Sequence, residues 1–208
     1  MTKFELGKWD LSGLVSDPKS SAFTKQLKDL ESKSKRFEKI RAQLSPNISP
    51  KKFQNILSQI ECISEKTSIV GGFASLYYSE DTQSDYATSL LTRVTKLGSE
   101  IENRMLFFDL WWKRKIDEKN ANRLVKDTGD LSNYLKYKRL MAKYSLSEPE
   151  EKIINTLDVT GIAALIKLYD KITNAFEYLI KVNGKKKKLG REQVTTLVRS
   201  KNGKIREA

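Results

Sequence analysis

The chain has 208 residues, of which 38% are apolar and 31% charged, and its net charge at pH 7 is +13. This composition excludes a membrane protein and a low-complexity tail. There is no histidine and one cysteine, Cys62, which excludes imidazole zinc sites, histidine-dependent nucleophile systems and an internal disulfide. The charged first ten residues do not fit a signal peptide, and the longest apolar run, Ile162–Ile166, is too short to span a bilayer. We therefore expect a soluble, cytoplasmic protein.

The first predicted helix occupies the region from Asp17 to Leu44. Apolar residues recur there every three or four positions, which is the helical period. Asp17-Pro18 is typical of a helix start, because the aspartate can cap the first turn and the proline ring suits it. Ser45-Pro46 ends the helix, since the residue before a proline is pushed out of helical geometry.

A second long helix is predicted to begin at Ser49-Pro50 and to continue to about Tyr77, with an apolar stripe along one side. Gly71 and Gly72 lie inside it, and each costs about 1 kcal/mol relative to alanine. We favour a close approach of another helix or a kink as the reason for these glycines. The alternative is a hinge.

A third long helix is predicted from about Leu90 to the tryptophan pair Trp111-Trp112. Neighbouring residues on a helix point about 100° apart, so both indoles are buried only if the helix packs on two sides. We favour this wide core face over a substrate-facing aromatic side chain. Shorter helices are predicted at roughly 118–126 and 131–143.

The pattern after residue 145 predicts two more helices. Ser147 and Glu150 have the spacing of a capping box, which begins a helix that continues through Leu157. Another helix is predicted from Gly161 to Ala175. Four of its apolar residues are predicted to lie on its buried side: Leu165, Leu168, Tyr169 and Ile172.

The last section changes to a period of two between Phe176 and Val182, followed by Asn183-Gly184. This dipeptide favours a type I′ turn, so we expect a small β-hairpin ending near Leu189 and then a short helix over 191–200. The predicted fold is mostly α: long antiparallel helices form a bundle with one β-hairpin near the C-terminus. We divide the chain into a helical domain, 1–175, and a hairpin with a short helix, 176–208.

Positive charge is concentrated near the C-terminus, where residues 181–208 carry ten Lys or Arg against two Glu. A dense basic region is typical of a nucleic-acid or acidic-partner surface. Lysines also protect exposed strand edges, which is the interpretation we favour for Lys185–Lys188. Cys62 is interpreted as a buried, inert thiol. We assign no catalytic, cofactor-binding or metal-binding residue in this chain.

Several short strings, taken together, resemble oligoendopeptidase F, a zinc metallopeptidase family related to thimet oligopeptidase. They occur in the family's order and at roughly its spacing along essentially the whole chain. The strings are Trp9-Asp10-Leu11-Ser12, residues 72–82 (GFASLYYSEDT), 105–110 (MLFFDL), 146–153 (LSEPEEKI), 182–185 (VNGK) and 206–208 (REA).

The resemblance implies the N-terminal helical region of such a peptidase, which forms one wall of a channel for short peptides. In that family an H-E-x-x-H motif of the C-terminal catalytic domain holds zinc and supplies the general base. None of those residues carries over to a chain without histidine. We therefore expect the chain alone to be non-catalytic and its partner to be its own catalytic domain, missing here, with zinc in the parent enzyme. Self-association through an exposed apolar face is a further expectation. The alternative is a stand-alone basic helical adaptor that binds nucleic acid or an acidic protein.

Overall fold

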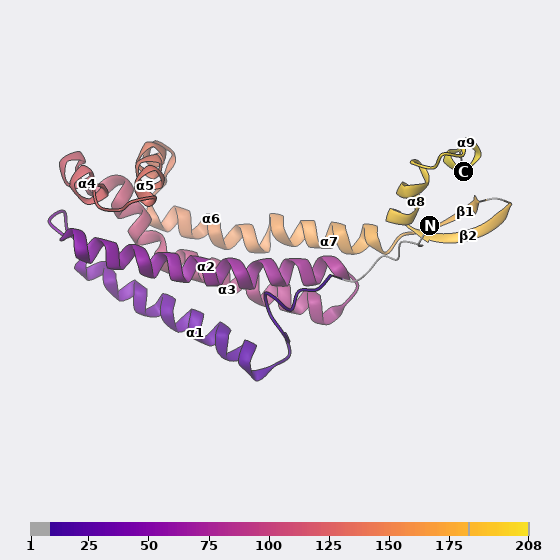
Figure 1. Ribbon diagram of the computed structural model, residues 1–208, viewed down its shortest axis with the longest axis horizontal. Coiled ribbons are helices and arrows are strands. Elements are labelled where there is room, and N and C mark those ends of the chain that lie inside the picture. The colour runs from indigo at the N-terminus through magenta and orange to yellow at the C-terminus, as the bar shows by residue number, and fades with distance from the viewer. Residues whose placement is uncertain (1–8, 183, 208) are drawn as a thin grey trace.

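The computed structural model describes residues 9–182 and 184–207. Three long antiparallel helices lie side by side, and a fourth rod, made of two helices end to end, lies along them (Figure 1). Two short helices stand at one end of this bundle, and the β-hairpin with the last two helices extends from the other (Figure 1). The prediction of a mostly helical bundle with one C-terminal hairpin is confirmed. The elements are α1 (Ser21–Glu38), α2 (Pro50–Glu80), α3 (Asp85–Leu110), α4 (Glu118–Val125), α5 (Leu131–Leu140), α6 (Glu148–Thr160), α7 (Ile162–Asn174), β1 (Glu177–Val182), β2 (Lys185–Gly190), α8 (Arg191–Leu197) and α9 (Gly203–Arg206), with 3₁₀ turns η1 (Lys39–Gln43) and η3 (Met141–Tyr144) and a π-helical turn η2 (Trp111–Lys115).

Serine hydroxyls begin the three long helices. The hydroxyls of Ser20, Ser49 and Ser84 each accept a backbone N–H of the first turn, which satisfies a donor that the helix leaves free. The prediction that Asp17-Pro18 begins α1 is wrong by one turn. The Asp17 carboxylate instead accepts the backbone N–H of Lys19 at 2.8 Å, so it closes a local turn before the helix.

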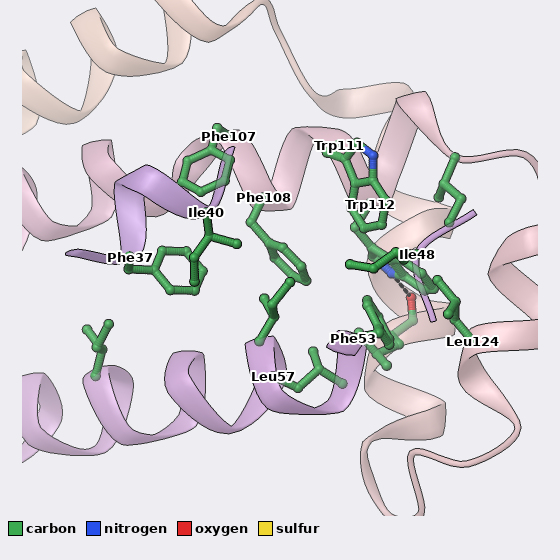
Figure 2. Close-up of a cluster of buried hydrophobic side chains, with 14 of the residues drawn as sticks. Phe37, Ile40, Ile48, Phe53, Leu57, Phe107, Phe108, Trp111, Trp112 and Leu124 are labelled. Carbon is green, nitrogen blue, oxygen red and sulfur yellow. Dashed lines mark hydrogen bonds between the residues drawn. The ribbon is translucent and has the colours of Figure 1, made fainter. Parts of the chain in front are cut away.

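The main core lies between α1, α2, α3 and the short helices, and it is rich in aromatic rings (Figure 2). Trp112 is completely buried, and its indole N–H donates to the carbonyl of Leu135 at 2.9 Å. Trp111 is also buried, and both indoles lie near the ring of Phe53, at 6.4 and 5.1 Å between centroids. Both indoles are therefore buried, which confirms the interpretation of the tryptophan pair as core.

No neighbouring helix packs closely against the two glycines inside α2. A Cβ added at Gly71 or Gly72 would meet no other heavy atom within 4 Å, apart from the local helix backbone. The expected close approach is therefore wrong, because α3 packs against another side of α2. The α2 helix continues unbroken through both positions. The hinge stays a prediction.

The C-terminal hairpin lies where the sequence predicts it. β1 and β2 pair antiparallel, with Val182 opposite Lys185 and Glu177 opposite Gly190. Gly184 has a φ of +78°, a conformation that glycine adopts at little cost. Asn183 of the predicted turn and Ala208 of the last resemblance string lie outside the described residues.

Candidate functional site

The two helices α6 and α7 expose their apolar side chains and turn their polar side chains toward the bundle. Leu165 is 65% exposed and Tyr169 57% exposed, so the prediction that this side of α7 is buried is wrong. The periodicity correctly grouped these residues on one face, but no other segment among the described residues covers that face. We name it the docking face, and it consists of Ile153, Ile154, Leu157, Ile162, Leu165, Ile166, Leu168, Tyr169 and Ile172.

The inner side of α6 meets α3 through polar groups. The hydroxyl of Ser99 donates to the carbonyl of Asn155 at 3.0 Å, and the side-chain amide of Asn155 donates to Asn103 at 3.0 Å. At its N-terminus, α6 is tied to η1 by Arg41, which donates to both carboxylate oxygens of Glu148 at 2.9 and 2.5 Å. These hydrogen bonds fix α6 without burying its apolar side chains.

The inner side of α7 is held to α3 by longer polar contacts. Lys167 donates to the Thr92 hydroxyl at 3.3 Å, and Lys171 lies 3.3 Å from the Asp85 carboxylate. Burial lowers the pKa of Lys167, in keeping with its place on the side of α7 that contacts the bundle. A usual surface helix has the opposite arrangement.

The capping box predicted at the start of α6 positions this face. Glu150 reaches back to accept the backbone N–H of Ser147 at 2.8 Å. Arg41 and Lys152 together lower the pKa of Glu148 to about 2, against the opposing effect of burial. The start of α6 is therefore the firmly held end of the docking face.

The lysines of β2 lie on the surface of the hairpin. Lys185–Lys188 are all exposed, as expected for a solvated strand. Lys188 forms an ion pair with Glu177 across the strands, and Lys181 lies opposite Lys186. Cys62 is half-buried rather than buried.

Among residues 9–182 and 184–207, no three His, Cys, Asp or Glu side chains come together as a metal site. In the same part of the chain, no helix combines the length and the apolar character needed to cross a bilayer.

The described residues form a helical scaffold that leaves one apolar face uncovered. Residues 114–178 match the family model for the N-terminal domain of M3 peptidases, described as oligopeptidase F. The match confirms the resemblance to the N-terminal region of oligoendopeptidase F. It extends from η2 into β1, so it includes the whole docking face and the string at 146–153, whereas the other strings lie outside it. No curated protein and no solved structure matches the chain.

Proposed function

We propose that this chain is the N-terminal, channel-forming helical domain of a cytoplasmic zinc metalloendopeptidase that hydrolyses short peptides. In this proposal the docking face packs against the catalytic domain of the same peptidase, which carries the zinc and the H-E-x-x-H motif. The 208 residues alone are non-catalytic. The observation that carries the proposal is the coincidence of the oligopeptidase F match with the uncovered apolar face of α6 and α7.

The size and nature of the face support a permanent protein partner. Contiguous exposed apolar patches above a few hundred Å² are unusual for a monomer. The nine large apolar residues of the docking face are each about half exposed or more. Burying an apolar side chain contributes roughly 1.5–3 kcal/mol, so covering even part of this face stabilises a complex strongly.

The coding sequence provides the first test. Downstream of the codon for Ala208, we expect an open frame that encodes an H-E-x-x-H motif. A stop codon at that point, or a continuation without such a motif, contradicts the proposal.

The second test is biochemical. We expect the purified chain to contain no stoichiometric zinc and to leave a quenched fluorescent nonapeptide intact. Adding the catalytic domain of the same peptidase, prepared as a separate chain, gives a complex that contains zinc and cleaves the peptide. Tightly bound zinc or cleavage with the 208-residue chain alone contradicts the proposal.

A matched pair of variants locates the contact. Leu165→Asp places a charge in the middle of the docking face and is expected to abolish the complex in size-exclusion chromatography. Ser58→Asp adds the same charge on an exposed position of α2 and is expected to leave the complex intact. Equal behaviour of the two variants contradicts docking through α6 and α7.

A further inference from the structure

The C-terminal hairpin is a two-stranded sheet whose second strand has a free edge. Among the described residues, β2 pairs with β1 alone, and no backbone hydrogen bond joins the other side of β2 to another segment. The hairpin extends beyond the α7 end of the bundle (Figure 1). A sheet of two strands is only marginally stable in water, and a third strand stabilises it. The edge of β2 is therefore a place where an extended segment can add.

This edge carries positive charge on both faces of the hairpin. Successive side chains of a strand point to opposite faces, so Lys186 and Lys188 lie on one face and Lys185 and Lys187 on the other. All four side chains are exposed. An extended segment beside β2 would meet ammonium groups on both of its own faces.

The charge on one of these faces is not balanced within the hairpin. Lys186 lies directly opposite Lys181 in the strand register, and like charges in this position destabilise a strand pair. Glu177 forms an ion pair with Lys188. Within residues 9–182 and 184–207, no carboxylate forms an ion pair with Lys181 or Lys186. An external anion on this face would relieve the repulsion between the two lysines.

The alternation of the lysines favours one kind of anion. A nucleic-acid backbone or an anionic membrane surface lies against one face of a hairpin, whereas an added strand presents side chains to both faces, as β2 does. A second copy of β2 would bring two rows of lysines together and be repelled. The same lysines discourage neutral strands from pairing with the edge. A strand with acidic side chains matches the edge in both backbone and charge.

We propose that β2 binds an extended acidic segment of a partner protein by strand addition. The backbone of the segment hydrogen-bonds to the free edge of β2. Its carboxylates pair with Lys186 on one face and with Lys187 on the other. The occupant is part of a folded partner and not a peptide to be cleaved. This surface is separate from the docking face and does not rest on the proposed function.

Fluorescence anisotropy with the full 208-residue chain and the labelled peptide Val-Thr-Glu-Glu-Glu-Glu-Thr-Val tests the proposal. We expect saturable binding at pH 7 and low ionic strength that weakens as salt is added. Replacing the four glutamates of the peptide by glutamine is expected to weaken binding about tenfold or more. N-methylation of the four glutamate nitrogens keeps the charge but removes backbone donors, and it is expected to weaken binding by a similar factor. Absence of saturable binding, or equal affinity for the N-methylated peptide, overturns the proposal.

Variants of the chain test whether both faces take part. Lys186→Gln and Lys187→Gln change opposite faces, and each is expected to weaken peptide binding about two- to fivefold. Lys25→Gln removes an exposed lysine of α1 and is expected to leave the affinity unchanged. An effect of Lys186→Gln or Lys187→Gln alone indicates an anion on a single face, as for nucleic acid or a membrane surface, and overturns the proposal. An equal effect of Lys25→Gln also overturns it, because the binding then reflects net charge.

Discussion

The core around Trp112 and the rod formed by α6 and α7 come from similar sequence patterns but have opposite environments. Around Trp112, aromatic rings from α1, α2, α3 and η2 meet aliphatic side chains of the short helices α4 and α5, and the described residues close this core (Figure 2). Along α6 and α7, the apolar side chains point away from the bundle and the polar ones toward it. One region is a closed interior, and the other is an apolar surface that the described residues leave uncovered.

This difference shows what hydrophobic periodicity can and cannot establish. A helical repeat of apolar residues identifies the side chains that share a face. It does not tell whether the segment that covers the face belongs to the described part of the chain. Substitutions in the two regions should therefore separate folding from association.

The largest effect is expected in the core. Trp112→Ala removes a fully buried indole and leaves the carbonyl of Leu135 without its hydrogen bond. We expect the free energy of unfolding to fall by about 3–5 kcal/mol, measured by urea denaturation. A loss below about 1 kcal/mol contradicts the description of this region as a closed core.

An intermediate effect is expected where α6 meets η1. The pKa of Glu148 is about 2 in the folded chain, below its ordinary value of 4.5, mainly because Arg41 donates to its carboxylate. The resulting stabilisation is fully present above pH 4.5 and is lost as the pH falls toward 2. Because Arg41 is about half exposed, we expect Glu148→Gln to cost only about 1 kcal/mol at pH 7.

Urea denaturation of the wild type and Glu148→Gln at several pH values measures this contribution. The stability difference between the two proteins is expected to shrink as the pH falls from 4.5 toward 2. A difference that stays constant over this window shows that the ion pair with Arg41 does not lower the pKa of Glu148.

The smallest effect on folding is expected on the docking face. Leu168 is 55% exposed, so Leu168→Ser should change the free energy of unfolding of the isolated chain by no more than about 0.5 kcal/mol. The same urea denaturation provides the measurement. A loss comparable to that of Trp112→Ala indicates that α7 packs its apolar side against the chain itself, contrary to this account.

The sequence allowed the fold class to be predicted because its signals are local. Ser49-Pro50 and the pair Ser147 and Glu150 begin helices through hydrogen bonds to their own first turn, and Gly184 supplies the positive φ of the hairpin turn. Asp17 shows the limit of such local signals. Its carboxylate accepts the backbone N–H of Lys19 and closes a turn before the helix, instead of capping the helix itself.

The site was harder to predict because it depends on contacts between distant segments. Leu165 and Tyr169 carried the pattern of a buried face, and only the polar contacts of Lys167 and Asn155 with α3 show which side faces the bundle. No single sequence motif marks this face.

Amide hydrogen–deuterium exchange tests the central claim most directly. The chain is measured alone and after addition of the catalytic domain of the proposed parent peptidase. We predict slower exchange in α6 and α7, centred on residues 153–172, and little change in α1, because the docking face is covered on binding. Unchanged exchange in α6 and α7, or protection confined to α1, would contradict the account.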